Sequence, residues 1–87
     1  MHNIEQAVHF LEKYNLVLST AESATAGLLA ATVAAVPGCD GVLESGFVVY
    51  SKHAMQASLG VKPETIETFG MNSEEVAREM AHGVLMA

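Results

Sequence analysis

Apolar and polar positions along the N-terminal half of the chain follow patterns typical of helices and of one buried strand. Apolar residues at helical spacing over 4–14, behind Asn3 as an N-cap, predict an amphipathic helix. A short apolar run at Leu16–Thr20 predicts a buried strand. Apolar residues then occur on every face of Thr25–Val36, which predicts a helix that is buried all round.

The C-terminal half begins with a second strand, predicted over Val42–Tyr50, and continues with three short helices. Each helix has its own start signal, and glycine ends the first two. Their predicted spans and signals are Ser51 to Leu59 before Gly60, Glu64–Phe69 between Pro63 and Gly70, and a last helix capped by Ser73. Two strands and about five helical segments indicate the α/β class, with helices packed on a small sheet.

The most informative segment is Ser19–Gly27, a run of small and polar residues between the first strand and the long apolar helix. This order places hydroxyls and backbone N–H groups at a helix N-terminus, where an anion or a developing oxyanion is stabilised. Ser23 is a candidate nucleophile, with the N–H groups of Thr25, Ala26 and Gly27 nearby. Helix capping by these hydroxyls is the alternative interpretation, because serine and threonine are common N-caps.

Length and charge limit the kind of partner. With 87 residues, the chain forms one domain at most, residues 1–87. Its net charge is −6, and its positive side chains are scattered, so we expect no nucleic-acid partner. A single nucleotide phosphate stays a candidate ligand, because backbone amides can hold it. The most apolar stretch, Gly27 to Val36, is too short to span a bilayer, so we expect no membrane partner.

Other features bear on location and on metal binding. Cys39 is the only cysteine of the sequence, which excludes an internal disulfide and fits a cytoplasmic location. The first five residues lack the basic and apolar regions of a signal peptide. Glu79 and His82 make only half of a carboxylate-bridged metal pattern, which is more often a solvated helix face, so we expect no metal.

Five separated motifs together indicate a family: Thr20–Gly27, Pro37-Gly38, Gly46–Ser51, Leu59–Val61 and Gly70–Ala77. Their order and spacing resemble the CinA C-terminal domain family, the nicotinamide mononucleotide deamidases, from about Leu16 to Ala87. The resemblance implies an α/β sandwich with helices on a mixed sheet. It also implies hydrolysis of the carboxamide of nicotinamide mononucleotide to the acid and ammonia, without a metal or organic cofactor.

The resemblance also implies roles for single residues. Ser23 matches the nucleophile, and Tyr50 matches the tyrosine at the end of the second strand. The implied contacts to the substrate come from the turn and from the second strand motif: Glu22, Thr25, Ala26, Gly27, Gly46, Phe47 and Ser51. From its position alone, Glu22 is either a group that orients the substrate or a favourable charge at a helix start.

Two positions depart from the family pattern. The general-base lysine expected five residues after the tyrosine is Met55, and a thioether cannot accept the serine proton. Lys52 lies on roughly the same helical face and is a candidate substitute, although its side chain leans away from the vacated position. A solvated lysine is the alternative. Ala26 replaces a glycine, and it is strained if the position requires a positive φ.

Two functions therefore stay open. The first is an amidohydrolase in which Ser23 attacks and Tyr50 and Lys52 assist. The second is an inactive relative that binds a nucleotide or acts as an assembly module. Because the family pattern continues with further strands and a last helix, we expect residues 1–87 to be an incomplete domain. An apolar surface left by those strands favours a homo-oligomer.

Overall fold

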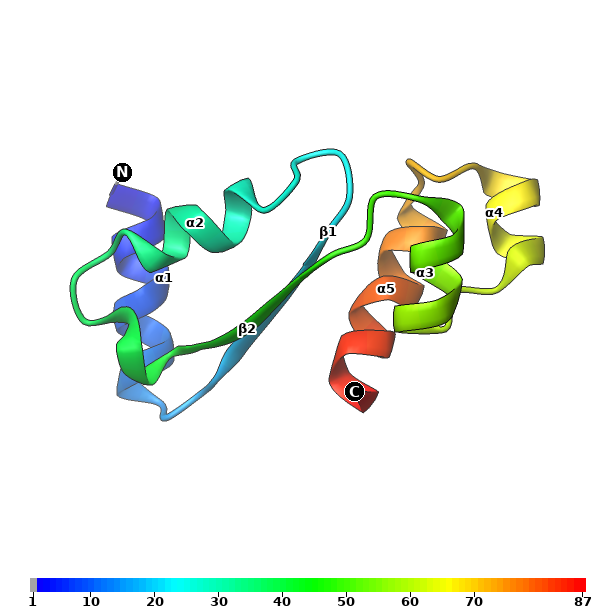
Figure 1. The fold of residues 1–87 in the computed structure, drawn as a ribbon. Coiled ribbons are helices and arrows are strands. Elements are labelled where there is room, and N and C mark those ends of the chain that lie inside the picture. The colour runs from blue at the N-terminus through cyan, green and yellow to red at the C-terminus, as the bar shows by residue number, and fades with distance from the viewer. Residues whose placement is uncertain (1) are drawn as a thin grey trace.

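The computed structural model describes residues 2–87, which form a two-stranded sheet between two groups of helices (Figure 1). In chain order the elements are α1 (His2–Lys13), β1 (Leu18–Glu22), α2 (Leu28–Ala34), the 3₁₀ turn η1 (Cys39–Gly41), β2 (Leu43–Val48), α3 (Lys52–Leu59), α4 (Pro63–Phe69) and α5 (Glu74–Met86). Helices α1 and α2 lie on one side of the strands, and α3, α4 and α5 lie on the other. The predicted α/β class is confirmed.

The two strands are parallel and are connected through α2 and η1, which makes a βαβ unit. Thr20 pairs with Gly46 and Glu22 pairs with Val48, with one irregularity near the start of β1. Both strands therefore end at the same edge of the sheet. Within residues 2–87, the mixed sheet implied by the resemblance is represented only by this parallel pair.

Each side of the sheet has an apolar core of its own. The α1–α2 core contains the buried side chains of Val8, Val33, Val36, Cys39 and Val42. The α3–α5 core contains those of Val49, Met55, Leu59, Val61, Ile66, Val76 and Met80. Because side chains alternate across a strand, β1 contributes Leu18 to the first core and Ala21 to the second.

Strand β1 begins and ends two residues later than the predicted strand Leu16–Thr20. The cause is the turn that ends α1. Asn15 has a left-handed φ of 55°, and the N–H of Leu16 still bonds to the carbonyl of Leu11 at 2.8 Å. As a result, Glu22 belongs to the strand and is not part of the turn that follows it.

Helix α2 is shorter than the predicted helix Thr25–Val36, and the prediction that it is buried all round is wrong. Leu28 is 64% exposed and Leu29 is 47% exposed, while Val33 is buried. Among the elements of residues 2–87, α2 packs on α1, η1 and the two strands, which cover only its inner side. Its apolar composition therefore does not correspond to burial in this chain.

The start signals predicted for the last three helices are confirmed, and so are the two glycines, Gly60 and Gly70, that end the first two of them. Ser51 and Ser73 cap α3 and α5, accepting hydrogen bonds from the backbone three residues later at 3.0 and 3.2 Å. Pro63 occupies the first turn of α4, and Gly60 ends α3 with a φ of 67°. These signals are local, so they could be recognised without knowledge of the tertiary structure.

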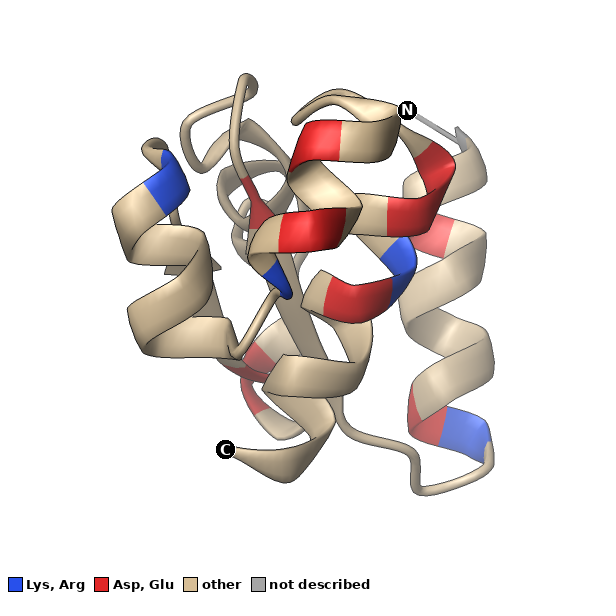
Figure 2. Ribbon diagram, turned by 90° about the vertical axis from the view of Figure 1, so that its right-hand side faces the viewer, with Lys and Arg blue, Asp and Glu red and all other residues tan. Residues whose placement is uncertain are grey.

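Helices α4 and α5 carry many of the acidic residues (Figure 2). Five of the ten acidic residues lie on these two helices: Glu64, Glu67, Glu74, Glu75 and Glu79. Arg78 is paired with Glu74 one turn away. Over residues 2–87, each helix is too short or too polar to reach across a lipid bilayer.

Candidate functional site

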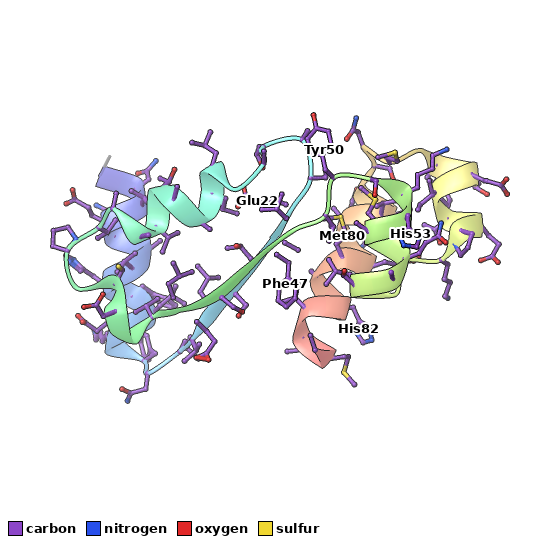
Figure 3. All side chains as sticks on the ribbon, viewed as in Figure 1. Glu22, Phe47, Tyr50, His53, Met80 and His82 are labelled. Carbon is purple, nitrogen blue, oxygen red and sulfur yellow. The ribbon has the colours of Figure 1, made fainter. Side chains whose placement is uncertain are left out.

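A groove of about 620 Å³ lies between the carboxyl end of β1 and the start of α5, and we call it the Ser23 groove. Ligands of open α/β folds bind at this edge, beyond the carboxyl ends of the strands. Figure 3 shows Glu22 and Tyr50 at this end of the sheet, and Met80 on α5. The groove is lined by Ala21, Glu22, Ser23, Ala24, Thr25, Leu29, Met71, Asn72, Ser73, Glu74, Ala77 and Met80.

A smaller recess of about 120 Å³ shares Ser23 with the groove. Ser23 and Ala24 line it from the end of β1, Tyr50 from the end of β2, and Met71 and Asn72 from the loop before α5. The structure thus brings together Ser23 and Tyr50, two of the three predicted catalytic residues. Both come from the carboxyl ends of the paired strands, and this explains why they meet.

Glu22 is buried, with 5% of its surface exposed, and its carboxylate caps helix α2. Its Oε1 accepts hydrogen bonds from the N–H of Leu29 at 2.7 Å and from the hydroxyl of Thr25 at 2.6 Å. Its Oε2 accepts one from the N–H of Ala30 at 3.0 Å. Burial raises the pKa of Glu22, but these hydrogen bonds outweigh burial and leave the pKa below its ordinary value. Glu22 is therefore ionised at neutral pH.

The N-terminus of α2 thus already holds an anion, and that anion belongs to the protein. The N–H of Ala26, one of the predicted oxyanion donors, bonds to the carbonyl of Ser23 at 3.0 Å. The N–H of Gly27, another of them, contributes to the lowered pKa of Glu22. The contacts of Glu22 match the interpretation in which its charge stabilises the start of a helix. The charge comes from the preceding strand and not from the first turn of the helix itself.

The turn between β1 and α2 uses left-handed backbone at two successive residues. Ala26 has a φ of 52° and Gly27 has a φ of 99°. The condition under which the sequence predicts strain at Ala26 is therefore met, because an L residue with a side chain disfavours this region. The turn reverses the chain so that the start of α2 faces the carboxylate of Glu22.

Three predicted substrate-binding residues make packing or capping contacts within the fold. A Cβ atom at Gly46 would lie 3.0 Å from the Thr20 hydroxyl and 3.1 Å from the Cβ of Ala30, so this position brings β2 close to α2. Phe47 packs on the α3–α5 core (Figure 3). Ser51 caps α3 with its hydroxyl. These contacts are structural, and the groove is lined by other residues.

Neither of the two candidate positions for a general base lines the groove. Met55 is 0% exposed and packs in the α3–α5 core. Lys52 is exposed in the first turn of α3. Among the described residues that line the groove, the ionisable side chains are those of Glu22 and Glu74, so this lining contains no lysine or histidine. Glu22 is bonded to the first turn of α2, which it caps, and Glu74 is paired with Arg78.

Sequence reasoning missed the loop between α4 and α5 as part of the site. Met71 and Asn72 line both the groove and the recess, and Ser73 lines the groove. The signal in the sequence was a polar residue directly before the N-cap of a helix, within a motif that supported the resemblance. Because α5 begins opposite the end of β1, such a residue faces Ser23 only after the chain has folded.

Glu79, the other acidic residue that the sequence singled out, joins α4 to α5. Its carboxylate accepts hydrogen bonds from the N–H of Lys62 at 2.9 Å and from the hydroxyl of Thr65 at 2.6 Å. The first of these bonds is the largest cause of its lowered pKa. Over residues 2–87, no three His, Cys, Asp or Glu side chains are grouped so that they could hold a metal ion.

Known proteins resemble this chain over nearly all of its length. The model of the CinA C-terminal domain family matches residues 2–87. A CinA-like protein of Chlorobium phaeobacteroides is 53% identical over 75 residues, which are 86% of this chain and 18% of that protein. A putative competence-damage inducible protein of Acetivibrio thermocellus is 46% identical over 78 residues, which are 90% of this chain and 19% of that protein.

Solved structures show the same likeness. A CinA superfamily protein of Escherichia coli has a TM-score of 0.90 and 34% identity, over 97% of this chain and 49% of that one. A competence/damage inducible protein of Agrobacterium tumefaciens has a TM-score of 0.88 and 38% identity, over 97% of this chain and 52% of that one. The chain thus spans about half of these solved chains and about a fifth of the curated relatives.

Proposed function

The chain belongs to the CinA C-terminal domain family, and on this premise we propose that it is a nicotinamide mononucleotide amidohydrolase domain with Ser23 as nucleophile. The observation that carries the proposal is the recess in which Ser23 meets Tyr50 at the carboxyl edge of the sheet. The groove that continues from it has a volume of about 620 Å³, within the range of sites that bind small molecules.

In the proposed reaction the carboxamide of the substrate enters the recess and the rest of the nucleotide occupies the groove. The Oγ of Ser23 attacks the carboxamide carbon, and the C–N bond breaks. The serine proton leaves with the nitrogen as ammonia. Water then hydrolyses the ester, which gives the acid and restores the hydroxyl of Ser23. Tyr50 donates a hydrogen bond to the substrate.

Binding without turnover is the second candidate function, and the position of Met55 favours it. The thioether that stands where the family pattern has a lysine is fully buried, and Lys52 is exposed outside the groove. In this candidate the groove holds a pyridine nucleotide, and the Ser23 hydroxyl lacks a group that takes its proton. The two candidates share the ligand and differ only in the chemical step.

Ammonia release from nicotinamide mononucleotide by the purified chain tests the proposal, with Ser23→Ala beside it. We expect the wild-type chain to release ammonia and the Ser23→Ala variant to release none, because alanine lacks the hydroxyl oxygen that attacks the carboxamide. Ser58→Ala is the matched control, since Ser58 lies on the exposed surface of α3 and should leave the rate unchanged. Equal rates in wild type and Ser23→Ala would reject Ser23 as the nucleophile.

Thermal denaturation with and without the nucleotide distinguishes binding without turnover from the absence of any binding. A ligand that binds only the folded state raises the melting temperature, and the rise continues with the logarithm of the free ligand concentration above the dissociation constant. A rise without ammonia release would support binding alone. A folded protein that shows neither effect with nicotinamide mononucleotide would contradict both candidate functions.

A further inference from the structure

Asn72 lines both the Ser23 groove and the recess, and in each it lies with Ser23. The recess has a volume of about 120 Å³, and it can hold a small polar group. Because the recess is much smaller than the groove, a group bound in it lies close to every residue that lines it. Whatever group lies against Ser23 in the recess therefore also lies within reach of Asn72.

The backbone on both sides of Asn72 is anchored. Gly70 has a φ of 85°, and its carbonyl accepts a hydrogen bond from the hydroxyl of Ser73 at 2.7 Å. The same hydroxyl accepts one from the N–H of Val76 at 3.2 Å, which caps α5. Met71 is half-buried against the α3–α5 core. The loop is thus held in place while the residue between its anchors, Asn72, is exposed to the groove.

Asn72 carries a carboxamide, which offers one acceptor oxygen and an NH₂ donor group. Among the described residues that line the groove and the recess, it is the single side chain of this type. A carboxamide in the substrate offers the complementary pair. Its NH₂ group donates to the oxygen of Asn72, and its carbonyl oxygen accepts from the NH₂ group of Asn72. Two such bonds would fix the plane of the substrate amide against Ser23.

We propose that Asn72 recognises the carboxamide of the substrate and positions it for Ser23. This inference rests on the proposed function and adds to it a residue that sets specificity. The acid product has two acceptor oxygens and no donor, so it can satisfy only the NH₂ group of Asn72. The site therefore favours a carboxamide over the corresponding carboxylate, because the side-chain oxygen of Asn72 is left without a donor when the acid is bound.

Calorimetric binding to the Ser23→Ala chain tests the proposal, because nicotinamide mononucleotide is not consumed by that variant. The probes are nicotinamide mononucleotide and its carboxylic acid counterpart. On this background Asn72→Ala should weaken binding of the amide about tenfold, equivalent to roughly 1.4 kcal/mol. Gln56→Ala is the matched control, since it removes an exposed amide from α3, away from the groove, and should leave both affinities unchanged.

Asn72→Asp gives a result that a purely structural role would not produce. Its carboxylate still accepts a hydrogen bond from the NH₂ group of the amide, but it repels the carboxylate of the acid. We expect the preference for the amide over the acid to increase at least tenfold. Unchanged affinity in Asn72→Ala, or an unchanged preference in Asn72→Asp, would overturn the role of Asn72 alone. Failure of the Ser23→Ala chain itself to bind the amide would overturn the proposed function and this inference together.

Discussion

At the scale of single residues, Met55 occupies a position where the family pattern and the surrounding core favour different side chains. The pattern places a base there, whereas the structure places a fully buried thioether among Val49, Leu59 and the other side chains of the α3–α5 core. Methionine fills such irregular space well because it is unbranched and flexible. The thioether therefore contributes to packing, and it has no proton chemistry.

Met55→Lys should destabilise the fold by roughly 2–4 kcal/mol, because it buries a charge without a partner. Burial lowers the pKa of the new amine, so the loss of stability should be largest at low pH and should shrink as the pH rises and the amine becomes neutral in both states. Met55→Leu, which conserves volume, should cost less than about 1.5 kcal/mol. Urea denaturation at several pH values measures both, and a pH-independent difference would contradict the prediction.

Elements are stabilised partly by residues that lie outside them, and α2 is the clearest example. It has seven residues and lacks a side-chain cap at its own N-cap, Gly27. The cap comes from Glu22 in β1, which binds the N–H groups of Leu29 and Ala30. An isolated helix of this length is not stable in water. The carboxylate therefore links the strand to the helix that covers it.

Glu22→Gln should lower the melting temperature at neutral pH, because it removes the charge that α2 and Thr25 stabilise. The pKa of Glu22 is lowered on folding, so its contribution is present above the unfolded pKa of about 4.3 and is lost as the pH falls through the folded value. The difference between wild type and Glu22→Gln should therefore shrink below about pH 4. Thermal denaturation between pH 3 and pH 7 measures it. Glu67→Gln, on the exposed surface of α4, is the control and should show little change at any pH.

The sequence allowed prediction of those elements whose ends have local signals. The helices with Ser51 and Ser73 as N-caps were predictable because each serine hydroxyl accepts a hydrogen bond from the backbone N–H three residues later. The start of α2 was not, because its cap reaches back to Glu22 and its first turn is displaced by left-handed Ala26. Its exposure was also unpredictable, since an apolar pattern does not say which neighbours are present.

The candidate site was predictable to the same limited extent. Ser23 and Tyr50 could be identified because each follows a strand and matches a motif, and the parallel pairing of the strands explains why they meet. The role of Glu22 as a cap and the packing role of Gly46 depend on α2 lying over the sheet. The position of Asn72 beside Ser23 depends on how α5 packs against β1, which local sequence does not specify.

At the scale of the whole molecule, the chain exposes many large apolar side chains for its size. Val17 is 61% exposed, Leu85 is 79% exposed and Met86 is 72% exposed. A shallow cavity between the start of β1 and the end of α5 is lined by Val17 and Leu85 among others. Exposed apolar surface of this kind favours association. A net charge of −6 opposes it, but this repulsion is weakened by salt.

We expect the chain to form a homo-oligomer whose population increases with concentration and with ionic strength. Sedimentation velocity over a range of protein concentrations measures this directly. Leu85→Lys should shift the population toward the monomer, because it replaces a side chain of the exposed apolar surface with a charged one; Leu85 is 79% exposed. Gln56→Lys, on the exposed surface of α3, adds the same charge elsewhere and should have a smaller effect. A monomer at all concentrations and salt levels would contradict the expectation.

The Ser23 groove has a further consequence, because its walls come from helices on opposite sides of the sheet. Leu29 comes from α2, which packs on the α1–α2 core, and Met80 belongs to the α3–α5 core. The nucleotide that we propose for this groove would touch both sides at once. Its binding free energy would then add to the contacts that the shared strands already make, so separating the two sides would require more free energy in the occupied protein than in the empty one.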